Sequence, residues 1–137
     1  HEPTEKFIIY DIKTSTRGWK DKEKKDEVKQ FQILLYKHFF SEQFGVDIEN
    51  IDVEFFIVKR KIWEESTYPQ KRVQSFVPSN GKTKVNKAKT ALTTFIEEVF
   101  NLDGSYKTTD HQAKPDKYTC KYCQFVGKKD LCNKGIS

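Results

Sequence analysis

The stretch Phe7–Ser15, "FIIYDIKTS", decides the fold because it joins a strand-forming run to an acid and a lysine. Its first four residues are continuously apolar, which predicts a strand buried on both faces if it lies centrally in a sheet. Alternate residues of a strand point to the same face, so Asp11 and Lys13 should place their side chains together at the strand's end. A purely structural ion pair is the alternative interpretation of such a common triplet.

The same two side chains would suit a metal-dependent hydrolase. The Asp11 carboxylate can bind a hard cation such as Mg²⁺, with the backbone carbonyl of Ile12 as a second oxygen ligand. Lys13 can orient or deprotonate an attacking water and offset the charge of a phosphate. The triplet therefore raises the hypothesis of phosphodiester hydrolysis, which needs support from the rest of the chain.

The next segment is expected to be an amphipathic helix over residues 26–43. Asp26 is predicted to be its N-cap or an acid of its first turn, and Gly45 is the predicted stop. The apolar residues that recur at helical spacing are Val28, Phe31, Leu35 and Phe39. Gln32 and Tyr36 are four residues apart and stack at the edge of this stripe, from which they could reach the strand end that carries the acid. The alternative is that both side chains only frame the core.

The second half of the chain predicts two strands and another helix. Residues 51–63 and 71–78 are rich in β-branched and aromatic types and should pair as an antiparallel hairpin. A helix is expected over about 82–100, and its apolar face would be Val85, Ala88, Leu92, Phe95 and Val99. This order of elements predicts an α/β fold with a mixed central sheet flanked by helices. We expect one domain, residues 1–137, with a core over 1–100 and a polar loop and cysteine tail over 101–137.

Composition bounds the class of protein. The 137 residues are 36% hydrophobic and 33% charged, which is typical of one modest globular domain. We find neither a signal peptide nor an apolar run of the roughly 20 residues that a spanning helix needs. We therefore expect a cytoplasmic protein with no membrane partner.

Charge is distributed unevenly along the chain. Residues 1–58 carry 9 basic and 12 acidic side chains, whereas residues 59–137 carry 16 basic and 8 acidic ones. Residues 59–89 hold nine basic side chains against Glu64 and Glu65 alone. A basic flank beside an acidic one suits a polyanion bound next to a metal site. A solvated lysine-rich surface is the alternative.

Three short motifs, in this order and spacing, resemble the RecB-like branch of the PD-(D/E)XK nuclease superfamily. They are "YDIKTS" at 10–15, "QILLY" at 32–36, and "CKYCQF" at 120–125 with a later cysteine. That branch includes phage exonucleases and CRISPR-associated adaptation nucleases. The resemblance covers most of the chain and implies a restriction-endonuclease-like core with an Mg²⁺- or Mn²⁺-dependent, exonuclease-like deoxyribonuclease activity in replication, recombination or repair.

The resemblance also implies roles for individual residues. Asp11 would be the metal ligand and Lys13 the catalytic lysine, while Gln32 and Tyr36 would support the site and touch DNA. Thr14 and Ser15 would lie near the scissile phosphate. Further contacts with DNA are expected from Trp19, Lys59, Lys61, Lys71, Arg72, Lys82 and Lys84, and along the helix from Lys87 and Lys89. Trp19 has an alternative place as a loop residue covering the core.

Two features depart from the family's pattern. The first metal-binding acid of the family has no counterpart here, and His1 and Glu2 lie too close to the strand to supply it. Since the chain begins with His1 and contains no methionine, we expect a fragment or processed chain, in which another chain or a missing segment completes the metal site. The activity of this chain alone is then in doubt.

The cysteines are the second departure. Cys120, Cys123 and Cys132 are spaced as Cys-x2-Cys-x8-Cys, whereas iron-sulfur members of the family have x5 at the second interval. An upstream cysteine could complete a [4Fe–4S] cluster, or His111 could complete a Zn²⁺ site, because three thiolates cannot fill four positions. Alternatively, the cysteines are free, and the aromatic residues between them pin the tail to the core. The odd count argues against a secreted disulfide framework.

A different functional class also fits these observations. The chain could be a non-catalytic nucleic-acid-binding or accessory module in which the nuclease-like core is only a scaffold. Such a module predicts salt-sensitive DNA binding with no Mg²⁺-dependent product.

Overall fold

The computed structural model describes residues 6–108 and 115–133. The chain forms two compact units, His1–Glu98 and Val99–Ser137. The first contains the sheet and the long helices and is the unit that carries the predicted active-site residues. The described residues include no helix long and apolar enough to cross a membrane.

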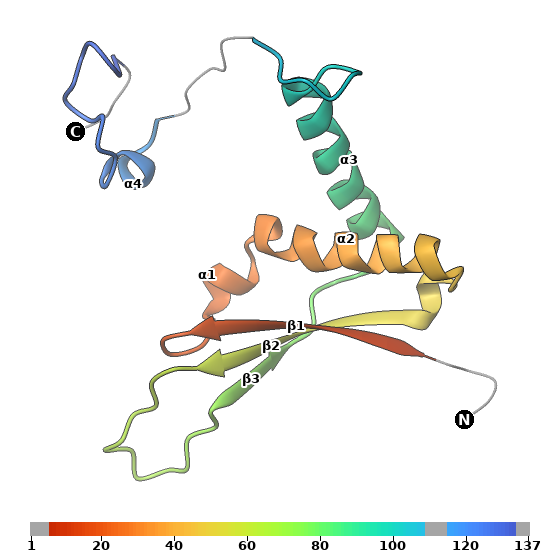
Figure 1. The fold of residues 1–137 in the computed structure, drawn as a ribbon. Coiled ribbons are helices and arrows are strands. Elements are labelled where there is room, and N and C mark those ends of the chain that lie inside the picture. The colour runs from red at the N-terminus through yellow and green to blue at the C-terminus, as the bar shows by residue number, and fades with distance from the viewer. Residues whose placement is uncertain (1–5, 109–114, 134–137) are drawn as a thin grey trace. The chain divides into compact units, whose positions relative to one another are not determined.

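A mixed three-stranded sheet is the centre of the first unit (Figure 1). Its strands are β1 (Phe7–Ser15), β2 (Ile51–Lys59) and β3 (Val73–Phe76), in the order β1-β2-β3. β1 pairs with β2 in parallel, and β2 pairs with β3 as an antiparallel hairpin. The predicted mixed sheet and hairpin are therefore confirmed, although both hairpin strands are shorter than the sequence patterns indicated.

Helix α2 (Glu27–Phe44) makes the crossover that the parallel pair requires. The short helix α1 (Asp21–Lys24) precedes it, and the 3₁₀ turn η1 (Ile48–Asn50) leads into β2. Both predicted ends of α2 are confirmed. The Asp26 side chain accepts from the backbone N–H groups of Val28 and Lys29, and Gly45 ends the helix in the left-handed region at φ 65°.

The hydrophobic core lies between β2 and two helices, α2 and α3 (Lys82–Val99). Alternate β2 side chains are fully buried, namely Ile51, Val53, Phe55 and Ile57, and the last three of them belong to the core cluster. Ile33 and Leu34 of α2 and Val85 and Ala88 of α3 pack against the same cluster. This alternation fixes the register of the sheet, because a slip by one residue would turn the apolar set outward.

The predicted buried face of α2 is only partly correct, because Phe31 and Leu35 pack against the core but the other two residues of the stripe do not. Val28 is 76% exposed and Phe39 is 49% exposed, whereas the buried residues are Ile33, Leu34, Lys37 and His38. The helix carries apolar residues on more than one side, so spacing alone did not distinguish the competing stripes. Lys37 tolerates burial because its Nζ donates to the carbonyl and side-chain oxygens of Asn80 at 3.0 and 2.8 Å. Burial lowers the pKa of Lys37.

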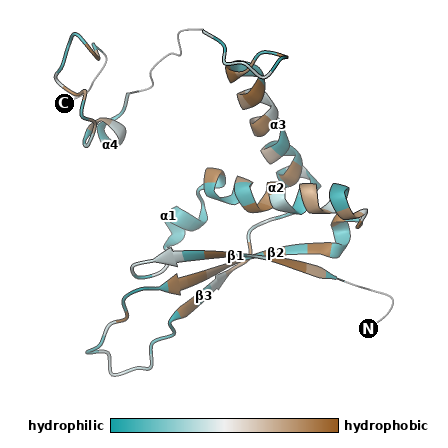
Figure 2. Ribbon diagram, in the orientation of Figure 1, coloured by the Kyte–Doolittle hydropathy of each residue, from teal (hydrophilic) through white to brown (hydrophobic). Residues whose placement is uncertain are grey.

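The expectation for β1 also needs correction. Its apolar run is not buried on both faces, since β1 lies at one edge of the three described strands. Ile9 packs on the core, whereas Ile8, Tyr10 and Ile12 on the other face are 50%, 53% and 68% exposed. Figure 2 shows that hydrophobic residues nevertheless extend along this strand.

Helix α3 is only partly covered. Val85 and Ala88 near its start are buried, but Phe95 and Ile96 are about half exposed, so the predicted apolar face contributes to the core only in its first turns. The second unit contains a bridge between Phe100 and Tyr106 and a short helix, α4 (Lys117–Cys120).

Candidate active site

Asp11 and Lys13 lie on β1, on the face that α2 covers. In the parallel register they are opposite Phe55 and Ile57, whose side chains belong to the core. The Asp11 side chain is only 10% exposed and the Lys13 side chain 30% exposed, and Lys13 Nζ lies 3.0 Å from Asp11 Oδ2. The Asp11 carboxylate thus lies at the boundary of the core, and the Lys13 ammonium, two residues further along the same face, is more exposed to solvent.

Helix α2 brings Gln32 and Tyr36 to the same point. Lys13 Nζ donates to Gln32 Oε1 at 2.7 Å, and Gln32 Nε2 donates to the Tyr36 hydroxyl at 2.7 Å. The four residues proposed from the sequence therefore form one continuous polar chain across a strand and a helix. Because the amide of Gln32 is engaged at both ends, its orientation and the direction of the Lys13 side chain are coupled.

One oxygen of the Asp11 carboxylate lacks a hydrogen-bond partner. Its Oδ2 is buried and makes no hydrogen bond, so the contact with Lys13 at 3.0 Å has ion-pair distance without hydrogen-bond alignment. A buried carboxylate oxygen in this state is suited to a hard cation. Mg²⁺ is commonly held by one or two carboxylates, with water and substrate phosphate oxygens completing its octahedron. Asp11 therefore fits as one protein ligand of such an ion.

No fuller cluster of metal ligands exists among the residues that the structure describes. No three His, Cys, Asp or Glu side chains within 6–108 and 115–133 gather around a common point. His111, the alternative Zn²⁺ ligand, lies outside these residues, as do His1 and Glu2. Among the ion pairs of the described residues, Asp11 is the only acid paired with Lys13.

The two hydroxyl residues after Lys13 lie on opposite faces of the strand. Thr14 is exposed and points away from the face of Lys13, as the alternation of a strand requires. Ser15 is on the Lys13 face, and its hydroxyl donates to the Gly18 carbonyl at 2.9 Å. Ser15 thus closes the turn that follows β1, whereas Thr14 is separated from the polar chain.

Trp19 packs against the core, in agreement with the alternative considered for it. Its ring centroid lies 4.9 Å from that of Phe55, and its backbone N–H donates to Gln74 Oε1 at 2.7 Å. Gly18 makes this approach possible, with φ at 97° and space so tight that a Cβ would lie 2.8 Å from Gln74 Oε1.

The basic residues of the hairpin gather at one pocket. Its volume is about 770 Å³, and among its lining residues are Arg17, Lys59, Arg60, Lys61, Trp63 and Arg72. Three of these, Lys59, Lys61 and Arg72, were expected from the sequence, whereas Lys71 is not among the lining residues. Arg17, Arg60 and Trp63 were missed, although the run Lys59-Arg60-Lys61 with a tryptophan two residues later was a visible signal.

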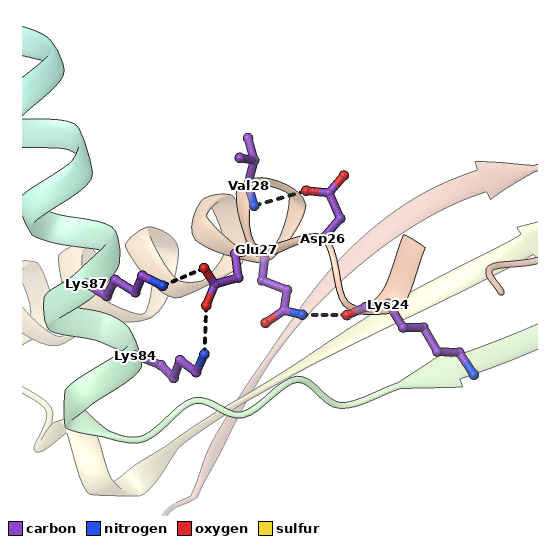
Figure 3. Close-up of polar contacts among 7 residues, drawn as sticks. Lys24, Asp26, Glu27, Val28, Lys84 and Lys87 are labelled. Carbon is purple, nitrogen blue, oxygen red and sulfur yellow. Dashed lines mark hydrogen bonds and ion pairs between the residues drawn. The ribbon is translucent and has the colours of Figure 1, made fainter. Parts of the chain in front are cut away.

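Three lysines of α3 are paired with acids, and Figure 3 shows the two that bind Glu27. Lys84 Nζ and Lys87 Nζ lie 2.9 and 2.5 Å from the two carboxylate oxygens of Glu27, and Lys82 Nζ lies 3.5 Å from Glu49 Oε1. Hydrogen bonds from Lys87 and Lys84 lower the pKa of Glu27 to about 2. Glu27 thus links the start of α2 to α3. The lysines expected to bind DNA therefore fall into two groups. Lys59 and Lys61 line the pocket, whereas the paired lysines of α3 are bound to acids.

The cysteines do not form a metal-binding group. Cys120 is buried, Cys123 and Cys132 are partly buried, and all three are free thiols. They are among the described residues, in which no cluster of three potential ligands is present. Tyr122 and Phe125, between them, are 86% and 43% exposed. The described thiols thus do not fit a Zn²⁺ ion or an iron-sulfur cluster as they stand.

Comparison with known proteins identifies one family that covers most of the chain. The family model of the PD-(D/E)XK nuclease superfamily matches residues 1–132. No curated protein and no solved structure gives a significant match.

Proposed function

Since the chain belongs to the PD-(D/E)XK nuclease superfamily, we propose that it is a metal-dependent deoxyribonuclease of exonuclease type, acting in DNA replication, recombination or repair. Membership implies a nucleic-acid substrate and a hydrolytic reaction. The observation that carries the proposal is the polar chain Asp11–Lys13–Gln32–Tyr36, in which an unsatisfied carboxylate and an ammonium lie 3.0 Å apart.

Asp11 would hold the Mg²⁺ or Mn²⁺ ion, with the Ile12 backbone carbonyl as a second ligand. When bound, such an ion supplies a water of lowered pKa and polarises the phosphate oxygens. Asp11 is suited to this role because its side chain is 10% exposed and fixed on a strand, so little freedom is lost on binding.

Lys13 would orient the attacking water. A lysine ammonium has three N–H groups, of which one is used in the hydrogen bond to Gln32 Oε1. Another can donate to the water or to a phosphate oxygen, while Asp11 balances the charge. In the reaction, a bond forms from the water oxygen to phosphorus, the bond from phosphorus to one ester oxygen breaks, and the leaving oxygen takes up a proton.

Gln32 and Tyr36 would act on either side of this step. Gln32 is a positioning residue, since it reaches the substrate only through Lys13 and Tyr36. The Tyr36 hydroxyl accepts from Gln32 Nε2, which leaves its own proton available for a phosphate oxygen of the DNA. Its side chain is 46% exposed, so DNA could reach it.

The DNA backbone would lie along the basic hairpin. Lys59 is opposite Ser15 in the parallel register and so continues the face of Lys13 toward the pocket. Lys61, Lys71 and Arg72 would extend this track. Lys82, Lys84 and Lys87 of α3 would join it only if DNA displaces their acidic partners.

The proposal is tested with full-length protein and end-labelled linear DNA. We expect cleavage with Mg²⁺ or Mn²⁺, none with a chelator, and a loss of about 10²- to 10⁴-fold in rate for Lys13→Ala. Lys25→Ala, an exposed lysine of the same unit, is the matched control and should cleave like wild type. Cleavage that survives Lys13→Ala would refute the site, whereas salt-sensitive binding with no metal-dependent product would favour the non-catalytic module.

A further inference from the structure

An exposed tryptophan lies among the cations of the hairpin pocket. Trp63 is 71% exposed, although burying an indole is strongly favourable. The pocket beside it has a volume of about 770 Å³ and is lined by five basic side chains, Arg17, Lys59, Arg60, Lys61 and Arg72. A flat aromatic surface and a group of cations are the two components with which proteins hold single-stranded nucleic acid.

Two of the cations are held in place before any ligand arrives. Arg60 Nη2 donates to the Thr16 hydroxyl at 3.0 Å, and Arg72 Nη1 donates to the Lys59 carbonyl at 3.4 Å. The backbone N–H groups of Arg60 and Lys61 donate to the carbonyls of Ser15 and Thr16, both at 2.8 Å. The start of the loop is therefore tied to the end of β1, which reduces the ordering cost of binding.

The pocket is close to the candidate active site. Lys59 is opposite Ser15 in the parallel register, and Ser15 is two residues from Lys13 on the same face. With a rise of about 3.3 Å per residue and strands about 4.8 Å apart, the backbone of Lys59 is roughly 8 Å from that of Lys13. This separation is short enough for adjacent nucleotides of one strand to occupy both places.

We propose that this pocket binds an unpaired nucleotide of single-stranded DNA, with its base stacked on Trp63 and its phosphate held by Arg60 and Arg72. The inference rests on the proposed nuclease function and assigns its substrate as a single strand or a frayed end. A duplex does not fit this role, because its bases are stacked on one another and cannot cover the indole. The pocket volume lies within the range of sites for small ligands, about 300–1,000 Å³, and so suits one or two nucleotides.

Glu64 and Glu65 also line the pocket. They reduce its formal charge from five positive to three positive, and they would repel phosphates placed beside them. The phosphate is therefore assigned to the arginine side of the pocket. The base carries no charge and is assigned to the side of Trp63.

The chain offers a direct optical test, because it contains only two tryptophans. The full-length protein would be titrated with an oligothymidine in a chelating buffer, so that binding is measured without cleavage. We expect strong quenching of tryptophan fluorescence in wild type, and its loss in Trp63→Phe, in which the core-packed Trp19 is the remaining emitter. Blunt duplex of equal length should bind at least about tenfold more weakly at the same salt concentration.

The affinity of these variants for oligothymidine distinguishes stacking of a base on Trp63 from nonspecific electrostatic attraction. Trp63→Ala should weaken binding of oligothymidine, measured by fluorescence anisotropy, by about 5- to 150-fold, whereas Trp63→Phe should keep affinity within about threefold. Tyr68→Ala is the matched control, since Tyr68 is 78% exposed in the same loop but does not line the pocket. Unchanged affinity in Trp63→Ala, an equal loss in Tyr68→Ala, or tighter binding of duplex would overturn the assignment.

The two proposals fail separately. Metal-dependent cleavage with binding that is independent of Trp63 would overturn the pocket and leave the nuclease. Binding that depends on Trp63 without any metal-dependent product would overturn the nuclease and leave a single-strand site.

Discussion

Replacing Gln32 by leucine should slow DNA cleavage moderately, by about five- to tenfold. The substitution keeps the size of the side chain but removes the acceptor of Lys13 and the donor to Tyr36, at 2.7 Å each. A hydrogen bond to a charged group contributes about 1.5–3 kcal/mol. Because Lys13 is 30% exposed, solvent screening reduces this to about 1–1.5 kcal/mol. That energy corresponds to the stated five- to tenfold loss of rate, because a smaller fraction of the Lys13 side chains is then correctly oriented.

The assay is single-turnover cleavage of linear DNA with Mg²⁺, which measures the chemical step without product release. Gln43→Leu makes the same substitution on the same helix, about 16 Å away, at an exposed position, and should leave the rate unchanged. The reasoning fails if Gln32→Leu matches wild type, since the hydrogen bond then does not position Lys13. It also fails if Gln32→Leu is as slow as Lys13→Ala, since Gln32 would then act in the chemistry itself.

Two further predictions concern the links that hold the helices in place. Asn80→Ala should lower the free energy of unfolding in urea by about 1.5–3 kcal/mol, because it removes one acceptor of the buried Lys37 ammonium. Lys37→Met removes the charge as well and should cost under about 1 kcal/mol, so an equal or larger loss in this variant would contradict the account. The lowered pKa of Glu27, about 2 against 4.5, means that its ion pairs stabilise the fold above pH 4.5 and lose this contribution as the pH falls through 2. The stability difference between wild type and Glu27→Gln should therefore shrink between about pH 6 and pH 2.5, and a difference that stays constant would show that Glu27 does not act through its charge.

Much of the site could be predicted because local rules place it. Residues two apart on a strand share a face, and residues four apart on a helix share a face, so each half of the polar chain followed from spacing. The contact between Lys13 and Gln32 also required α2 to pack on the face of β1 that carries Lys13. The crossover between parallel strands made such packing a reasonable expectation, but the hydrogen bond itself needed coordinates.

The errors have a physical origin in tertiary packing. Val28 and Phe39 fitted a helical stripe as well as Ile33 and Leu34 did, but Ile33 and Leu34 are the pair that packs in the core. The helix also buries Lys37, whose hydrogen-bond partner is Asn80. That partner lies 43 residues away in the chain, so no local pattern reveals it. Tertiary contacts routinely override such patterns.

The hairpin pocket illustrates the limit for binding residues. Trp63 looked like the end of a strand, because "KIW" continues the apolar and basic pattern of β2. Pairing with β3 instead runs only from Phe55 to Val58, which leaves the tryptophan in a loop, where it is exposed. Sequence patterns predict the ends of strands less reliably than their centres. Trp63, the residue proposed to stack on a base, lies just beyond such an end.

The central claim is that Asp11 is the metal-binding acid of a nuclease site, and its most direct test is the single-turnover cleavage rate of Asp11→Asn. The substitution keeps the shape of the buried side chain and removes its charge. The account predicts a loss of at least about 100-fold in Mg²⁺, with DNA affinity in chelator unchanged within about threefold. A cleavage rate within about threefold of wild type would contradict it.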